Sequence, residues 1–248
     1  MMMSTGQNHS QDPARPDMAA DTTARRNAAA ETDTPACVEF ANVSFSRGNT
    51  VILDNLTFDL KKGERLGLIG DIGAGKTTLL HIIVGLIKPT SGVIRVLGAP
   101  RTIEADFRAV RKRVGLVFQN ADDQLFCPTV LEDVAFGPLN LGFSPGEAKS
   151  RAAATLARVG MAGFEDRVTY RLSGGEKRLI ALATVLAMEP DILLLDEPFN
   201  GLDTQAAARV LNLLHTLSQS MMIVSHDQTR LPAVATRQLR LENGRVCQ

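Results

Sequence analysis

The sequence is poor in cysteine, has no excess of either charge and contains no long apolar segment. Its three cysteines, Cys37, Cys127 and Cys247, are odd in number and too scattered for a zinc cluster, which indicates a reduced, intracellular protein. Lys plus Arg and Asp plus Glu both number 27, so net charge does not point to a nucleic acid or a membrane surface as partner. The longest strongly apolar run, residues 179–188, is shorter than the roughly 20 residues that span a bilayer. A membrane role would therefore require a partner protein.

Composition divides the chain near residue 36. Residues 1–36 are rich in Ala, Thr, Asp, Arg and Pro and show no apolar periodicity. They lack the apolar core of a secretory signal, and their acidic residues argue against a transit peptide. We expect a disordered tail over 1–36 and one large folded domain over 37–248.

The stretch from residue 70 to residue 78 matches the phosphate-binding pattern G-x-x-x-x-G-K-[ST] at every fixed position. An apolar run before it predicts a buried strand, and residues 79–86 after it predict a buried helix. Glycines let the backbone turn its N–H groups toward a phosphate, and the helix N-terminus adds its positive end. Lys76 is expected to reach the β- and γ-phosphates, and the Thr77 hydroxyl to bind Mg²⁺. The predicted nucleotide-binding residues here are Gly70, Asp71, Ile72, Gly73, Ala74, Gly75, Lys76, Thr77 and Thr78.

Two carboxylates, Asp196 and Glu197, directly follow the apolar strand predicted over 192–195. A strand that ends in this way places both at the carboxyl edge of the sheet, at the level of the phosphate loop. Asp196 is expected to hold Mg²⁺ through water, and Glu197 to orient and polarise the water that attacks the γ-phosphate. Without the phosphate loop, a helix-capping acid and a surface acid would explain the pair equally well.

A third stretch, Leu172-Ser173-Gly174-Gly175-Glu176, begins a predicted helix. Ser173 and Glu176 form a capping box, so by itself this stretch predicts no more than a helix start. The glycines that follow the cap, Gly174 and Gly175, would open the backbone to close approach by an anion.

Strands alternating with helices from residue 65 onward predict a parallel sheet covered on both faces. Before them, strands over 38–45 and 51–60 are separated by a turn at Gly48 and Asn49. The segment 119–168 contains three prolines, which predict short helices. One helix starts at a capping box from Ser144 to Glu147 and is expected to run through an Ala-rich stretch to Gly160. The predicted class is α/β, with a P-loop NTPase core, an N-terminal antiparallel β subdomain and an inserted helical subdomain at about 120–170.

With three motifs in this order, the sequence resembles the ATP-binding-cassette ATPases from residue 38 to residue 246. The resemblance implies ATP and Mg²⁺ as cofactors and a head-to-tail dimer in which Ser173, Gly174 and Gly175, in the signature motif of one subunit, close over the phosphate loop of another. It also implies that Gln119 contacts magnesium, that His226 contacts the γ-phosphate as the switch histidine, and that Asp203 belongs to the loop linking the two composite sites.

Some positions depart from the usual pattern of that family. Asp71-Ile72 stands where Pro-Asn is more frequent, and Glu176 replaces the more frequent Gln. Arg47 lies about where the family often places an aromatic side chain that stacks on adenine, and a planar guanidinium can stack as well. The other histidines (His9, His81 and His215) are expected to be structural.

The segment 117–138 is similar to the energy-coupling-factor importers, which bring cobalt, nickel, biotin and other vitamins into bacteria. This implies an ATPase subunit at the cytoplasmic face of the bacterial inner membrane, with a transmembrane coupling subunit, a substrate-binding membrane subunit and no nucleic acid. Cobalt or nickel is slightly preferred over biotin or another vitamin. The second cassette is an identical copy or a paralogue, and the complete motif set favours a homodimer.

Apolar residues in the proline-rich segment fit two roles, a core for the helical subdomain or a groove for a helix of the transmembrane partner. They are Leu125, Phe126, Val130, Leu131, Val134 and Phe136.

Two rival functions fit the sequence less well than an importer ATPase does. A soluble cassette acting on nucleic acid or the ribosome would typically carry two cassettes or a long coiled-coil insertion, and a small-molecule kinase would not explain the signature stretch or His226.

Overall fold

The structure is a computed structural model that describes Met1, residues 34–227 and residues 229–247. The tail predicted over 1–36 lies outside the described residues except at its ends. The folded unit begins at Pro35 and contains two sheets.

The first sheet is antiparallel, with the strand order β2–β1–β4–β5. Its long hairpin joins β1 (Ala36–Arg47) to β2 (Thr50–Lys61) through the predicted turn at Gly48 and Asn49. The hairpin pairs through β1 with β4 (Ser91–Val96), which pairs with β5 (Ala99–Pro100), a two-residue strand that sequence analysis did not predict. The predicted antiparallel β subdomain is therefore confirmed.

The second sheet has six strands in the order β10–β9–β3–β8–β7–β6 and is parallel except for the β9–β10 pair. The strands are β3 (Arg65–Ile69), β6 (Val114–Val117), β7 (Ile192–Asp196), β8 (Ser220–Val224), β9 (Arg237–Glu242) and β10 (Arg245–Cys247). Asp196 at the end of β7 pairs with Val224 at the end of β8. The ends of neighbouring parallel strands thus bring residues distant in sequence to one edge.

The two faces of this sheet contact different cores, because successive strand residues point to opposite sides. Leu193 and Leu195 pack in the core that includes residues of the helices α6 (Gly174–Leu186) and α7 (Thr204–Thr216). Leu194 packs in the core formed with α2 (Lys76–Ile83), α3 (Glu104–Arg111) and the antiparallel sheet. Strands β7 and β8 are buried at every residue, as the unbroken apolar runs of both strands predict. The predicted α/β class is confirmed.

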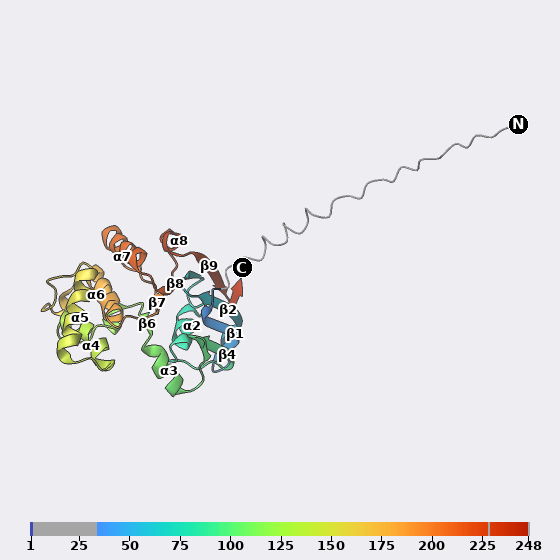
Figure 1. The fold of residues 1–248 in the computed structure, drawn as a ribbon, viewed down its shortest axis with the longest axis horizontal. Coiled ribbons are helices and arrows are strands. Elements are labelled where there is room, and N and C mark those ends of the chain that lie inside the picture. Colours follow the sequence, from blue (N-terminus) through green and yellow to red (C-terminus); the bar gives the residue numbers. More distant parts are fainter. Residues whose placement is uncertain (2–33, 228, 248) are drawn as a thin grey trace. The chain divides into compact units, whose positions relative to one another are not determined.

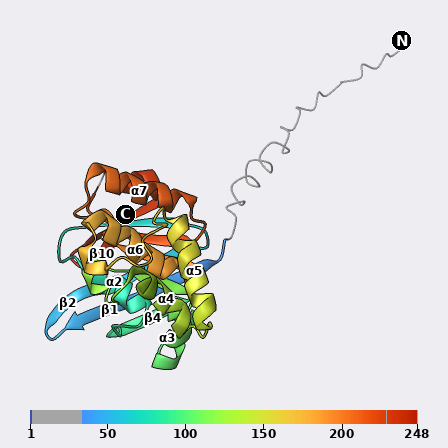
Figure 2. The same cartoon turned by 90° about the vertical axis from the view of Figure 1, so that its left-hand side faces the viewer.

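The helices α4 (Val130–Asn140) and α5 (Pro145–Arg158) lie together with α6 at one end of the folded unit, away from β1, β2 and β4 (Figure 1), and this end faces the viewer in Figure 2. The prediction that helices here are short is wrong for α4, which has 11 residues and continues through Pro138. Helix α5, with 14 residues, covers the Ala-rich stretch as predicted and ends two residues before Gly160. The predicted capping box at Ser144 is present, and Thr129 caps α4 in the same way. Good caps stabilise these helix starts despite the prolines.

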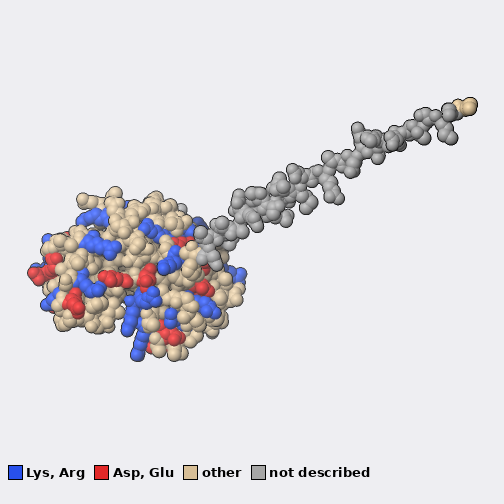
Figure 3. Space-filling model, in the orientation of Figure 1, with Lys and Arg blue, Asp and Glu red and all other residues tan. Residues whose placement is uncertain are grey.

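The apolar residues of this segment divide into a buried set and an exposed set. Val130 and Val134 are fully buried in the core beneath α6, whereas Phe126 and Phe136 are 65% and 45% exposed. Among the described residues, no helix combines the length and the apolar character needed to cross a membrane. The face seen in Figure 3 carries Lys and Arg interspersed with Asp and Glu.

Candidate active site

The phosphate loop connects β3 to α2 by a path that only glycine permits at its ends. Gly75 has φ +100°, and a Cβ there would lie 2.6 Å from Leu53 Cδ2. At Gly70 a Cβ would lie 2.2 Å from the Leu241 carbonyl oxygen. Gly75 is also the N-cap of α2 and offers no capping side chain, so the first N–H groups of the helix have no side-chain acceptor from that position. The loop is thereby built as an anion cradle.

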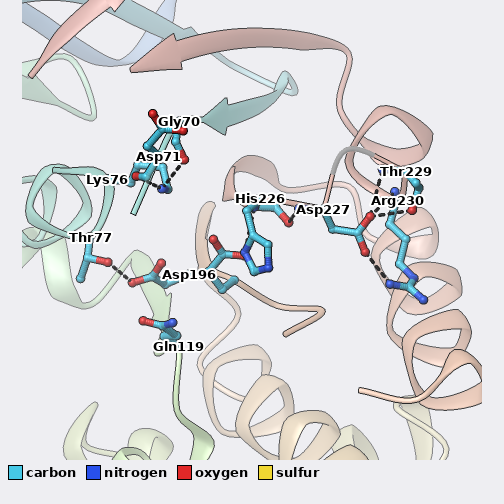
Figure 4. A network of polar contacts seen from close by, with 12 residues as sticks. Gly70, Asp71, Lys76, Thr77, Gln119, Asp196, His226, Asp227, Thr229 and Arg230 are labelled. Atoms are coloured by element: carbon cyan, nitrogen blue, oxygen red, sulfur yellow. Dashed lines mark hydrogen bonds and ion pairs between the residues drawn. The ribbon is translucent and has the colours of Figure 1, made fainter. Parts of the chain in front are cut away.

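Lys76 lies under this loop, 8% exposed. Its Nζ donates to the carbonyl oxygens of Gly70 at 2.7 Å and Asp71 at 2.8 Å (Figure 4). An ammonium group has three donors, so two hold the loop and one is available to a phosphate.

Oxygen ligands meet beside the loop, where α2 faces the end of β7. The Thr77 hydroxyl donates to Asp196 Oδ2 at 2.7 Å, and Gln119 lies next to Asp196 (Figure 4). Asp196 is 3% exposed, and its Oδ1 has no hydrogen-bond partner among the described residues. Burial raises the pKa of Asp196, the charge of Glu197 raises it further, and the Thr77 hydrogen bond opposes both. A buried carboxylate oxygen without a partner is a position suited to a cation.

Glu197 turns back from the strand end toward β8. It is 6% exposed and has φ +48°, and its N–H donates to the Val224 carbonyl at 2.9 Å. Its Oε2 lies 2.8 Å from His226 Nδ1 and accepts the His226 backbone N–H at 3.2 Å. A positive φ in a residue other than glycine is strained and marks functional sites. Here the strain places the carboxylate against His226.

A cavity of about 360 Å³ unites most of these residues. Its lining residues are Arg47, Ile52, Ile72, Gly73, Gly75, Lys76, Thr77, Thr78, Gln119, Asp196 and Glu197. Arg47 and Ile52 come from the β1–β2 hairpin, so the antiparallel sheet closes one side of the cavity. Sequence analysis did not identify Ile52, because in the sequence it is one apolar residue of a strand. Gly70, Asp71 and Ala74 are absent from this lining, although Asp71 and Ala74 border a neighbouring hollow.

The signature stretch lies elsewhere. The Ser173 backbone N–H donates to Glu176 Oε2 at 2.7 Å, which completes the predicted capping box, and Arg167 offsets the charge of Glu176 at 3.5 Å. Ser173, Gly174, Gly175 and Asp203 are not among the lining residues of the cavity. One chain therefore does not bring the signature stretch together with its own phosphate loop.

The two signature glycines have different surroundings. A Cβ on Gly174 would meet no atom within 4 Å, whereas a Cβ on Gly175 would lie 2.7 Å from Ala206 Cβ in α7. Asp203 caps α7 by accepting the Ala206 N–H at 2.7 Å. Packing of α6 on α7 therefore already requires glycine at 175, which the sequence pattern did not reveal.

Comparisons with known proteins agree with this geometry. The family model described as ABC transporter matches residues 53–200. The chain is 53% identical over 196 residues to a putative ABC transporter ATP-binding protein of Nitratidesulfovibrio vulgaris, an alignment covering 79% of this chain and 72% of that protein. The chain belongs to the ABC transporter ATP-binding proteins; it binds ATP and is an ATPase.

Within that class the chain is similar to energy-coupling-factor ATPases. It is 43% identical over 203 residues to the energy-coupling factor transporter ATP-binding protein EcfA of Methanocaldococcus jannaschii, covering 79% of this chain and 72% of that protein. It superposes with a TM-score of 0.79 and 32% identity on cbiO1 of Clostridium perfringens, part of the ABC transporter complex cbiONQ, covering 86% and 87% of the two chains. The resemblance drawn from the sequence is thus confirmed.

Proposed function

We propose that this chain is the ATP-hydrolysing subunit of an energy-coupling-factor importer at the cytoplasmic face of the bacterial inner membrane. One observation carries the proposal: Lys76, Thr77, Asp196 and Glu197 line one cavity, whereas Ser173 and its glycines do not. A site with all hydrolytic groups but no signature residues is completed by a second cassette. A solved ATP-binding cassette bound to ADP and phosphate, which is dimeric, has a TM-score of 0.78 and 27% identity to this chain, covering 85% of this chain and 97% of that one.

The residues beside the phosphate loop fit Mg²⁺. The unpartnered Asp196 Oδ1, the Thr77 hydroxyl and the Gln119 amide oxygen are hard oxygen donors, the type that Mg²⁺ prefers, and all three residues line the cavity. Bound there with nucleotide, the cation would offset charge on the phosphate oxygens.

Hydrolysis then depends on groups of this chain. Lys76 and the N-terminus of α2 bind the phosphates, and Arg47 stacks on the adenine from the hairpin. His226 fixes Glu197 Oε2 through its ring and its backbone N–H, and we assign the other oxygen, Oε1, to the attacking water. From that position Glu197 accepts a proton from the water as the water oxygen bonds to the γ-phosphorus and the bond between the γ-phosphorus and the oxygen bridging it to the β-phosphate breaks, which releases ADP and phosphate.

The role of Glu197 is tested by Glu197→Gln. An amide orients water less well and cannot accept its proton, so turnover should fall by roughly 100-fold or more, as for loss of a general base. Nucleotide binding should persist, and the variant should accumulate as an ATP-bound dimer on size-exclusion chromatography. Undiminished phosphate release by this variant would remove Glu197 from its role.

The need for two cassettes is tested by dilution. Phosphate release per molecule should fall once the protein is diluted below its dimer dissociation constant, because each site lacks signature residues of its own. An unchanged rate per molecule at every concentration would refute the shared site. Mixing an inactive Lys76→Ala chain with an inactive Ser173→Arg chain should restore part of the activity only if sites are composite.

An apolar groove in the helical region is the proposed contact for the transmembrane coupling subunit. The groove has a volume of about 320 Å³ and is lined by Cys127, Pro128, Leu131, Glu132, Ala135, Phe136, Leu139, Pro145 and Lys149. Phe136 stacks edge-on against Phe126 at 4.9 Å beside it, and both rings remain exposed. Apolar side chains exposed in one place fit the apolar face of a helix.

Docking is tested by Phe136→Asp, with Tyr170→Asp as the control because Tyr170 is 72% exposed and does not line the groove. Only Phe136→Asp should lose copurification with the coupling subunit, and both should keep ATPase activity as isolated proteins.

The transported substrate we propose is cobalt or nickel. Deletion of this protein should lower uptake of one of these ions, and lowered biotin uptake instead would replace the metal by a vitamin. Unchanged uptake of metals and vitamins would refute the importer role.

A further inference from the structure

The main chain of Phe118, the residue before Gln119, is held by helix α6 and by Gln124. Strand β6 ends at Val117, so Phe118 is the first residue beyond it. The Phe118 N–H donates to Gln124 Oε1 at 3.1 Å, and the Phe118 carbonyl accepts from Arg178 Nη1 at 2.7 Å. Both main-chain polar groups of Phe118 therefore have side-chain partners that belong to α6 or are attached to it.

Gln124 is the side chain that attaches this peptide to α6. Its Nε2 donates to the Ala181 carbonyl at 2.8 Å and to Thr184 Oγ1 at 2.7 Å, while its Oε1 accepts from Phe118. One amide thus uses both of its donors on α6 and its acceptor on the loop. A side chain that forms hydrogen bonds to two elements at once fixes the distance between those two elements.

Two further contacts join the same elements. Arg178, 4% exposed, places Nη2 2.5 Å from the Gln119 carbonyl, and Lys177 pairs with Asp122 at 2.5 Å. Thr77 and Asp196 instead belong to α2 and β7. Gln119 is therefore attached to the helix that carries the signature stretch, while the other cation-binding residues are attached to the sheet.

We propose that Gln124 is a positioning residue for Gln119: by fixing Phe118 to α6, it sets where the Gln119 side chain stands opposite Asp196. The inference rests on the proposed function in assigning Gln119 to the cation. It adds that the affinity for the cation depends on a residue that does not line the nucleotide cavity. No sequence motif signals this role, because the partners of Gln124 are 57 and 60 residues away along the chain.

The test is Gln124→Met, which keeps the length of the side chain and removes all three hydrogen bonds. The control is Gln238→Met, at an exposed position on β9. Two quantities are measured on the full chain: amide hydrogen exchange at Phe118 without nucleotide, and the Mg²⁺ concentration that gives half of the ATP-induced rise in Tm. Neither is a measurement of turnover.

In Gln124→Met, Phe118 should exchange faster and the Mg²⁺ requirement should rise, each by roughly 3- to 10-fold, the effect of losing a hydrogen bond of ordinary net strength. In a Gln119→Ala background, Gln124→Met should raise the Mg²⁺ requirement no further, because its effect passes through Gln119. Gln238→Met should change neither quantity.

Unchanged Phe118 exchange in Gln124→Met would overturn the inference, as would an equal rise in Mg²⁺ requirement with and without Gln119. If Gln119→Ala raises the Mg²⁺ requirement and Gln124→Met does not, the inference alone fails. If Gln119→Ala leaves that requirement unchanged, the cation assignment of the proposed function fails, and the inference fails with it.

Discussion

Replacing Asp196 by Asn should stabilise the protein without ligands and abolish its stabilisation by magnesium and ATP. The native carboxylate is 3% exposed, receives one hydrogen bond from Thr77, and leaves Oδ1 without a partner in the described part of the chain. A buried charge held by one neutral donor opposes folding. Asn keeps the shape and the acceptor for Thr77 but removes the charge.

The magnitude follows from the burial. A buried polar group left without a partner costs about 1–3 kcal/mol and a charged group costs more, so replacing the carboxylate by a neutral amide removes part of this cost. In a domain of 150–250 residues each kcal/mol shifts Tm by about 2–4 °C. Taking the lower part of that range, about 1–2 kcal/mol, Asp196→Asn should raise Tm without ligands by roughly 2–8 °C. Native protein at 100 times the dissociation constant of Mg·ATP should gain about 2.7 kcal/mol, and the variant should gain almost none of it.

The pH dependence gives a second measure of the same charge. Burial raises the pKa of Asp196, so the stability associated with this group is present below its unfolded pKa of about 4 and is lost as pH rises through its folded pKa. The Tm of the variant should therefore exceed the Tm of the native protein by an increasing amount as pH rises above about 4. Asp133, another buried carboxyl with a raised pKa, is unchanged in both proteins and does not contribute to the difference.

Thermal unfolding followed by the fluorescence of an added hydrophobic dye, in EDTA and then with Mg·ATP, measures both effects; a dye is needed because the chain has no tryptophan and one tyrosine. The matched control is Asp191→Asn, since Asp191 is a half-exposed carboxylate paired with Arg113 at 2.6 Å. That pair is worth about 0–1 kcal/mol, and its loss should lower Tm slightly and leave the Mg·ATP effect intact. A lower Tm in EDTA for Asp196→Asn, or a full response of that variant to Mg·ATP, would refute the reasoning.

Three further predictions concern other parts of the molecule. Gly175→Ala should destabilise the protein by about 1–3 kcal/mol in urea unfolding through the contact with Ala206, whereas Gly174→Ala should change stability little; equal effects would contradict the packing argument. Arg47→Ala should weaken ATP binding roughly 2- to 5-fold and leave tripolyphosphate binding unchanged, and Arg47→Phe should restore ATP binding. If Arg47→Ala weakens the binding of both ligands, Arg47 binds phosphate instead of adenine. Burial and the Asp133 charge raise the pKa of Cys127 to about 11. Its alkylation by iodoacetamide, followed by peptide mass spectrometry, should therefore be slow at pH 7 and increase about tenfold per pH unit up to pH 9, because the thiolate is the reactive form. A rate independent of pH would disprove this.

The local parts of the site could be predicted from the sequence alone. A phosphate loop needs glycines at fixed offsets from a lysine between a strand and a helix, and all of these features lie within about fifteen residues. The buried parallel strands were equally readable, because continuous apolar runs such as 192–195 fit no exposed position. Capping boxes at Ser144 and Ser173 were predicted correctly for the same reason: their hydrogen bonds span three residues.

Contacts between residues that are distant in the sequence became visible only in the folded structure. The hydrogen bond from Thr77 to Asp196 joins positions 119 residues apart, and the placement of Arg47 beside the phosphate loop depends on the hairpin folding over the sheet. Gly175 has a packing reason that is visible only once α7 lies against α6. Nothing in the sequence distinguishes Gln124 from other loop residues, but in the structure its side chain forms hydrogen bonds to both Phe118 and α6. Local hydrogen bonds and apolar runs depend on residues that are neighbours in the sequence, whereas contacts between elements exist only after the chain has packed.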